Sequence, residues 1–293
     1  MKWLSHLKKM RSASKMGDFF PSFENSRSAP LGSSEIPTHG SIWRRLDQEV
    51  LWFRCSEHRV PFPNIKKTIR ILHLTDLHIR EKNPWLIQMC HFFSTLHADI
   101  VVYTGDIVTK GWTQEAVDLL FSSAPKGSMG SFAVMGNWEH WSKAKPDQWR
   151  PILREHDVQL LVEEQVCFED FGIFGTDDHL AGTSRPDSWT FANKPYIALS
   201  HSPAFFPKLC IDPIRLVLSG HAHGGQMRIP LLKALWVPKG TDHYVSGWFH
   251  HNKQHLFVSR GLGWSVAPLR LFCPPEAAYI DLIPCQDSFF SDQ

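Results

Sequence analysis

The feature that most constrains the fold of this chain is a series of apolar segments that each end in a cluster of polar residues. Five of these segments are predicted strands, at residues 69–74, 99–103, 131–135, 195–199 and 214–218, and the cluster after each contains Asp, Asn or His. Apolar residues at helical spacing predict helices at residues 85–96, 114–121 and 147–156. This alternation predicts an α/β domain built from β-α-β units. The polar clusters at successive strand ends are then expected to converge on one crevice.

The two ends of the chain show weaker patterns. Residues 12–40 are rich in Ser, Pro and Gly without a clear period, and residues 42–53 have apolar residues at helical spacing. We therefore expect an irregular N-terminal leader over residues 1–60, a domain over residues 61–285 and a C-terminal tail over residues 286–293. Further short strands are predicted within residues 159–176, at 256–259 and at 277–283.

Composition narrows the class of protein. The net charge is +2, from 31 Lys and Arg against 29 Asp and Glu, so nucleic acid is not an expected partner. The six cysteines form no C-x-x-C pair, which fits a reduced compartment. No apolar stretch has the roughly 20 residues that span a bilayer, and we expect a cytoplasmic protein. The basic N-terminal residues 1–11 are either a frayed end or a segment that lies on the inner face of the cytoplasmic membrane.

The polar clusters supply a set of side chains that suits metal ions. Two carboxylates, one amide and four imidazoles are available, with no thiolate: Asp76, His78, Asp106, Asn137, His201, His221 and His223. Such ligands suit Mn, Fe or Zn ions. Seven ligands exceed the needs of one ion with an open position, whereas two divalent ions that share a carboxylate use them all. The alternative is that Asp76 and Asp106 cap helices and that His201 is a core histidine.

The order of these motifs, D-x-H, G-D, G-N-x-E, H and G-H-x-H, resembles the signature of calcineurin-like metallophosphoesterases over roughly residues 68–283. The resemblance implies a four-layer α/β/β/α sandwich with a dinuclear metal site. It puts Asp76, His78 and His223 on one ion and Asn137, His201 and His221 on the other, with Asp106 as the bridge. Residues 219–226, 258–263 and 274–276 resemble the bacterial YkuE- and YaeI-like branch, which includes a UDP-2,3-diacylglucosamine pyrophosphatase of lipid A synthesis.

One position departs from the usual family motif G-N-H-[DE]. Trp138 stands where the family has a histidine that helps to protonate the leaving oxygen, and an indole cannot deliver a proton. Three hypotheses follow. His140 reaches in from two residues further on, the leaving group is a pyrophosphate that needs little help, or activity is reduced. The candidate catalytic residues are therefore His140 and Asn137.

The chemistry of such a site predicts an enzyme. Two cations about 3.5–4 Å apart neutralise a phosphoryl group, and a hydroxide bound between them attacks phosphorus in line. We expect a hydrolase of phosphodiester or pyrophosphate bonds. Aromatic residues in 227–236 and 244–251 either form a wall for a lipid-linked substrate or pack behind the site. The alternative functions are a non-catalytic interaction module on the same fold and a protein phosphatase.

Overall fold

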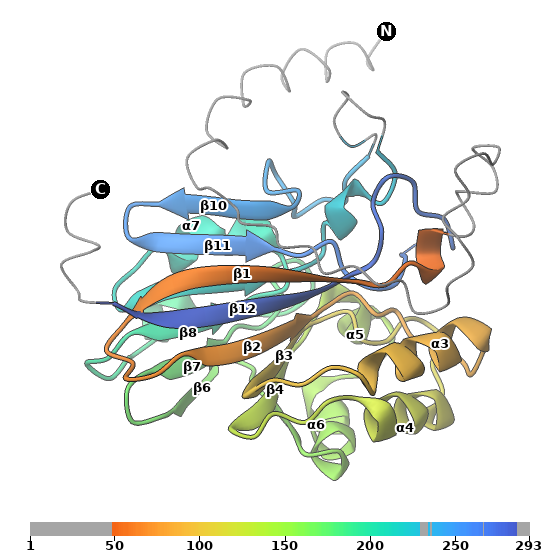
Figure 1. Cartoon of the computed structure of the whole chain (residues 1–293), viewed down its shortest axis with the longest axis horizontal. Helices are drawn as coiled ribbons and strands as arrows, with labels where there is room; N and C mark the ends of the chain where they lie inside the picture. The colour runs from red at the N-terminus through yellow and green to blue at the C-terminus, as the bar shows by residue number, and fades with distance from the viewer. Residues whose placement is uncertain (1–48, 229–233, 235, 266, 286–293) are drawn as a thin grey trace, which may run out of the picture.

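Two six-stranded sheets face each other in the computed structural model, which describes residues 49–228, 234, 236–265 and 267–285 (Figure 1). The first sheet has the order β1 (Arg54–Pro63), β12 (Glu276–Cys285), β2 (Ile69–Leu74), β3 (Ile100–Thr104), β4 (Gly130–Val134) and β5 (Val158–Leu160). The second has the order β10 (Gly247–His251), β11 (Gln254–Val258), β9 (Ile214–Ser219), β8 (Tyr196–Leu199), β7 (Gly172–Gly175) and β6 (Glu164–Cys167).

The strands that precede the polar clusters run parallel, as the sequence predicts. Strands β2 to β5 are parallel in the first sheet, and β7, β8, β9 and β11 are parallel in the second. The edge strands β6 and β10 are antiparallel to their neighbours, and β12 is antiparallel to β2. Because β2 to β5 share a direction in the first sheet, and β7, β8, β9 and β11 share one in the second, the carboxyl ends of each set lie at one edge of its sheet.

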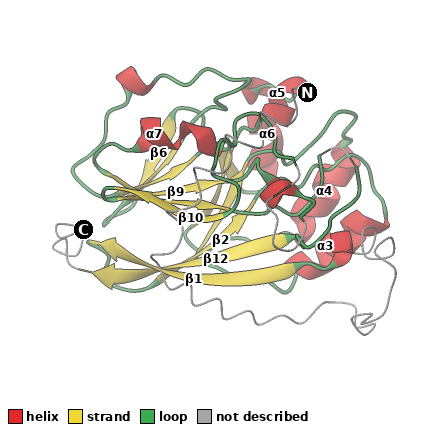
Figure 2. Ribbon diagram, turned by 90° about the horizontal axis from the view of Figure 1, so that it is seen from above, coloured by secondary structure: helices red, strands yellow, loops and turns green. Residues whose placement is uncertain are grey.

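Helices cover the outer faces of both sheets (Figure 2). The helices are α3 (Pro84–Phe93), α4 (Gln114–Ser123), α5 (Asn137–Trp141), α6 (Pro146–Glu155) and α7 (Phe206–Leu209), with short 3-10 turns at Glu49–Leu51, Pro186–Ser188, Pro203–Phe205 and His223–Gly225. Helix α3 begins at Pro84, and the side chain of Asn83 accepts a hydrogen bond from the Leu86 N–H at 2.9 Å. Helices α3, α4 and α6 pack on the first sheet, whereas α7 packs on the second.

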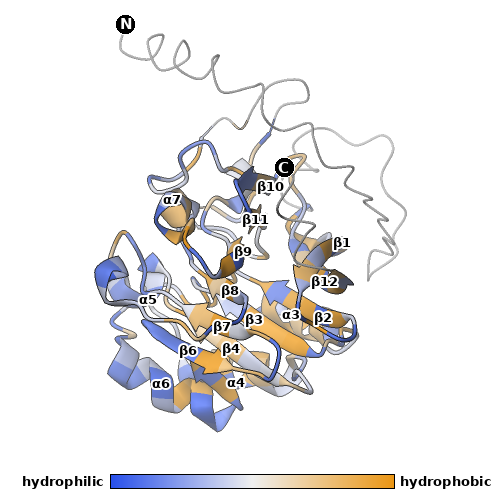
Figure 3. Ribbon diagram, turned by 90° about the vertical axis from the view of Figure 1, so that its left-hand side faces the viewer, coloured by the Kyte–Doolittle hydropathy of each residue, from blue (hydrophilic) through white to orange (hydrophobic). Residues whose placement is uncertain are grey.

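Strand periodicity divides the core into three apolar layers. In β2, Ile69 and Ile71 face the second sheet, whereas Leu72 and Leu74 face the helices. This alternation follows from the two-residue period of a strand. Much of β2, β3 and β4 is orange in Figure 3, while the outer turns of α6 are blue. One apolar layer between the sheets and one on each outer face make the four-layer α/β/β/α sandwich that the family resemblance implies.

Several boundaries differ from the expectations. Strand β1 pairs with β12 along its whole length, so the expected boundary between residues 60 and 61 falls inside a strand of the first sheet. Short elements were not predicted at β10, α5 and α7, because segments of four or five residues carry too little periodicity. The predicted basic segment 1–11, most of the predicted helix 42–53 and the tail 286–293 lie outside the described residues. In the part of the chain that the structure describes, no helix is long and apolar enough to cross a membrane.

Candidate metal centre

The seven predicted ligands lie on the loops that follow five strands. Asp76 and His78 follow β2, Asp106 follows β3, Asn137 follows β4, His201 follows β8, and His221 and His223 follow β9. All seven are buried. Six form two clusters, Asp76 with His78 and His223, and Asp106 with His201 and His221; within each cluster the ligand atoms lie within 4.8 Å of one another. Asn137 joins the second cluster, because its Oδ1 lies 3.1 Å from Nε2 of His201.

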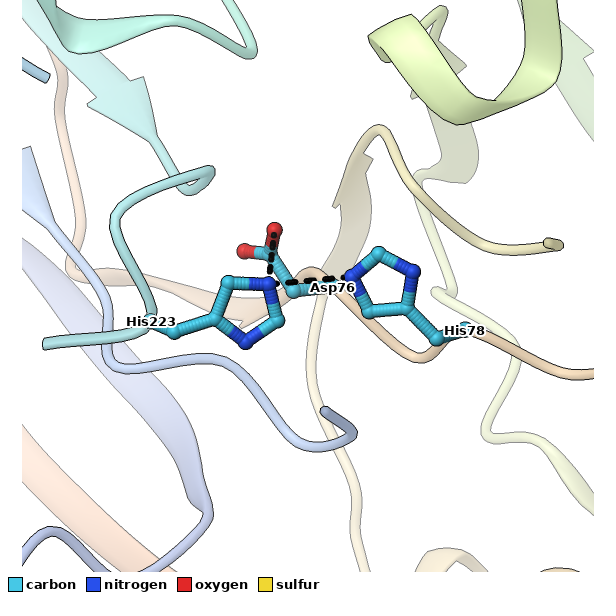
Figure 4. Close-up of side chains that lie close together, drawn as sticks. All are labelled: Asp76, His78 and His223. Atoms are coloured by element: carbon cyan, nitrogen blue, oxygen red, sulfur yellow. Dashed lines mark hydrogen bonds and ion pairs between the residues drawn. The ribbon is translucent and has the colours of Figure 1, made fainter. Parts of the chain in front are cut away.

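In the first cluster, two imidazoles and a carboxylate point toward one another (Figure 4). Nε2 of His78 lies 3.0 Å from Nε2 of His223, which lies 3.4 Å from Oδ1 of Asp76. The two rings are stacked at an angle of 18°. The buried Nδ1 atoms of His78 and His223 have no hydrogen-bond partner within the described ranges. Two ring nitrogens that face a single carboxylate are a donor set that a divalent cation satisfies.

In the second cluster, backbone carbonyls fix the histidine tautomers. Nδ1 of His201 donates to the Thr104 carbonyl at 2.7 Å, and Nε2 of His221 donates to the Lys239 carbonyl at 2.7 Å. The other two ring nitrogens, Nε2 of His201 and Nδ1 of His221, lie 3.1 Å apart. A histidine that donates one N–H to a carbonyl presents the lone pair of its other nitrogen to a metal.

Asp106 lies between the two clusters. Its Oδ2 is 3.2 Å from Nε2 of His201 and 3.7 Å from Nε2 of His78. Its Oδ1 accepts a hydrogen bond from the Trp138 N–H at 2.8 Å, which fixes the carboxylate plane. One oxygen therefore faces both clusters. The two donor sets and the carboxylate between them fit two divalent transition-metal ions.

Burial of these histidine and aspartate side chains disfavours their charged forms unless a cation is bound. Burial lowers the pKa of His78 and His223 well below 6.5 and that of His221 to about 3, so these rings are neutral and able to bind metal. Burial raises the pKa of Asp106 to about 7, against the attraction of His201. For His201, burial lowers the pKa, but the charge and hydrogen bond of Asp106 outweigh burial and raise it well above 6.5. Divalent ions would replace the proton that this pair shares.

The ligand loops depend on an uncommon backbone conformation. Five ligands have positive φ angles: Asp76 (54°), His78 (51°), Asp106 (53°), His221 (66°) and His223 (51°). Residues other than glycine rarely adopt this conformation, and it persists where the surrounding structure imposes it. Here backbone hydrogen bonds join the two neighbouring loops, from Asp76 N–H to the Gly105 carbonyl at 3.1 Å and from His78 N–H to the Asp106 carbonyl at 2.9 Å.

Glu139 holds the loop that carries Asp106. Its fully buried carboxylate accepts three backbone N–H groups, from Asp106 at 2.8 Å, Gly136 at 2.7 Å and Val108 at 3.0 Å. Gly136 is required in this arrangement, since a Cβ there would lie 2.3 Å from Oδ1 of Asp106. The glutamate of the G-N-x-E motif therefore acts on the site through the backbone.

Helix α5 carries Trp138, which replaces the histidine of the usual family motif, and His140. The Trp138 ring packs edge-on against His78, with centroids 5.9 Å apart, and also contacts Trp141, whose side chain is exposed. Trp138 thus occupies its position as a packing residue. His140 lies two residues further along α5, and its Nε2 is 2.7 Å from Oδ1 of Asp177.

Two residues near the site were missed from the sequence. Asp177 follows β7, so the same strand-end pattern that marked the ligands could have identified it. Arg270 is fully buried and donates to the carbonyls of Gly261 and Gly263, which belong to the loop against Asp76. No sequence signal marks Arg270, because an isolated arginine is usually exposed.

The predicted aromatic wall is in part a packing feature. Trp248 packs against the apolar layer between the sheets, and Tyr244 and Phe249 pack against the outer layer beside α7. Residues 229–233 and 235 lie outside the described residues, whereas Trp236 is exposed.

Comparison with known proteins decides the family. The profile of the calcineurin-like phosphoesterase family matches residues 69–225, which include all seven ligands. The chain belongs to this family. It is therefore a phosphoesterase, and the resemblance inferred from the motifs is confirmed.

Bacterial relatives have similar sequences. The chain is 27% identical to "Phosphodiesterase YaeI" of Escherichia coli over 79% of its length and 89% of that protein. It is 26% identical to "UDP-2,3-diacylglucosamine pyrophosphatase LpxG" of Chlamydia muridarum over 71% of its length and 82% of that protein. Among solved structures, a dimetal phosphatase from Danio rerio matches with a TM-score of 0.40 and 10% identity, over 67% of this chain and 88% of that one.

Proposed function

We propose that this phosphoesterase hydrolyses phosphodiester or pyrophosphate bonds with two divalent ions, manganese being the first to test. The observation that carries the proposal is the position of Oδ2 of Asp106, 3.2 Å from His201 and 3.7 Å from His78. Two ions at these clusters supply charge neutralisation for the phosphoryl group and a water of lowered pKa, so that a nucleophile exists at neutral pH.

The residues of the chain have separate roles in this proposal. Asp76, His78 and His223 would hold one ion and Asn137, His201 and His221 the other, with Asp106 shared between the two sets. Asn137 also contacts a phosphoryl oxygen as a catalytic residue, since a side-chain amide at the first residue of α5 points toward the centre. Glu139 and the paired backbone hydrogen bonds keep the ligands in place before substrate binds.

For the natural substrate, we propose a lipid-linked pyrophosphate such as UDP-2,3-diacylglucosamine, met at the inner face of the cytoplasmic membrane. The support is the likeness to the Chlamydia muridarum pyrophosphatase and the two exposed tryptophans, Trp141 and Trp236.

The test compares substrates on manganese-loaded protein. UDP-2,3-diacylglucosamine, a glycerophosphodiester and a cyclic nucleotide are assayed for kcat/KM, with Asp106→Asn as the inactive control and metal content measured for both proteins. A preference of at least tenfold for the pyrophosphate supports the lipid A proposal, and a preference for the diester replaces it. Protein that binds no transition metal and hydrolyses none of the three substrates would instead be an interaction module.

A further inference from the structure

The side chains of His140 and Asp177 are mostly buried and form a hydrogen-bonded pair. The His140 Nε2 to Asp177 Oδ1 distance is 2.7 Å, and the side chain of His140 is 16% exposed. The aspartate is itself fixed, because Oδ1 accepts the Asp178 N–H at 2.8 Å and Oδ2 accepts the Thr183 N–H at 2.7 Å. A carboxylate held by two backbone N–H groups holds the imidazole in one orientation and one tautomer.

Two connections in the structure link this pair to residues of the second metal cluster. His140 is three residues after Asn137 on α5, and residues at this spacing lie on the same helix face. On the other side, Asp178 accepts a hydrogen bond from the hydroxyl of Ser202 at 3.1 Å, and Ser202 follows the ligand His201. The pair is therefore tied to Asn137 through the helix and to His201 through the loop after β7.

We propose that His140 protonates the leaving oxygen of the substrate and that Asp177 is its positioning residue. This inference rests on the proposed hydrolysis. As the nucleophile forms a bond to phosphorus, the bond from phosphorus to the leaving oxygen breaks and its electron pair stays on that oxygen. The oxygen takes the proton from Nδ1 of His140, while Nε2–H continues to donate to Asp177. The neutral imidazole then regains a proton from water.

The surroundings of His140 favour the protonated form that an acid needs. The hydrogen bond to Asp177 raises the pKa of His140 and outweighs its partial burial, and the charges of Asp177, Asp178 and Glu139 act in the same direction. Within the described residues, the only side-chain hydrogen bond found for His140 is the one through Nε2. Trp138 offers no such proton, since an indole N–H does not ionise in this range.

The experiment varies the basicity of the leaving group. His140→Gln and Asp177→Asn are assayed in manganese-loaded form on bis(4-nitrophenyl) phosphate, whose leaving group needs no proton, and on glycerophosphoethanolamine, whose leaving alkoxide does. We expect kcat on the glycerol ester to fall about 10²-fold or more in both variants, within the range of general acid catalysis, and kcat on the nitrophenyl ester to change less than about fivefold. The alkaline fall of the kcat/KM profile on the glycerol ester disappears in His140→Gln.

A matched control is the pair of His156, which directly follows α6, and Asp118 on α4, with a 3.0 Å contact between Nε2 and Oδ1. His156→Gln is expected to retain wild-type rates on both substrates. Equal losses on both substrates in the His140 and Asp177 variants, or no loss on either, overturn the inference. If wild-type protein with its ions bound cleaves neither diester nor pyrophosphate, the proposed function itself fails, so the two failures are distinct.

Discussion

Substitution of Glu139 tests whether the hydrogen bonds that its carboxylate accepts from the backbone stabilise the loop that carries Asp106. In Glu139→Ala, the N–H groups of Asp106, Gly136 and Val108 lose their acceptor inside the protein. A buried N–H without a partner costs about 1–3 kcal/mol, so the three together cost about 3–9 kcal/mol before any relaxation. Domains of this kind have about 5–15 kcal/mol of total stability. The alanine variant is therefore expected to lose a large share of its free energy of unfolding at 25 °C.

Glu139→Gln separates the effects of the two carboxylate oxygens. Oε2 accepts two of the N–H groups and Oε1 accepts the Val108 N–H, so a glutamine can keep the first two bonds with its carbonyl oxygen and lose the third. We expect a loss of about 1–3 kcal/mol, clearly smaller than in the alanine variant. Urea unfolding of metal-free protein measures both values, and metal titration measures the accompanying loss of affinity at the Asp106 sites.

Glu164→Gln is the matched control for this series. Its carboxylate pairs with Arg150 at 2.9 Å on the surface, so the substitution should cost less than about 1 kcal/mol. The reasoning is refuted if Glu139→Ala is destabilised by less than about 1 kcal/mol, or if the alanine and glutamine variants lose the same free energy.

Three further predictions follow from the same structure. His78→Ala should reduce the bound transition metal from two ions to one per chain without loss of fold, as elemental analysis and circular dichroism would show. Arg270→Lys should cost about 2–4 kcal/mol in urea unfolding and weaken metal binding at Asp76, because an ammonium cannot reach all the carbonyls that the buried guanidinium serves. Burial lowers the pKa of His73 to about 3, so the unfolded chain takes up a proton below pH 6.5 that the folded chain does not. Stability due to His73 is thus complete above pH 6.5 and falls by about 2 kcal/mol by pH 5, and His73→Gln should flatten the urea midpoint over that window.

The helices and strands that were predicted well are those whose own residues show a clear apolar pattern. Strand β2, residues 69–74, is predicted with its observed bounds, since its apolar residues stop directly before the polar cluster that starts at Thr75. Strand β10 and helix α5 were missed because each has only five residues, too few to show a period. Strand β1 was assigned to a leader, because nothing in its own residues shows that it pairs with β12 more than 200 positions away.

The seven candidate metal ligands could be picked out from the sequence alone, because each follows closely after a strand whose apolar pattern is local. The distances between these side chains were decided only by the tertiary structure. His78 and His223 are 145 residues apart and face each other because two sheets pack through one apolar layer. The same packing brings Asp177 to His140 and Arg270 to the loop beside Asp76, contacts that depend on side-chain reach across loops and leave no periodic trace in the chain.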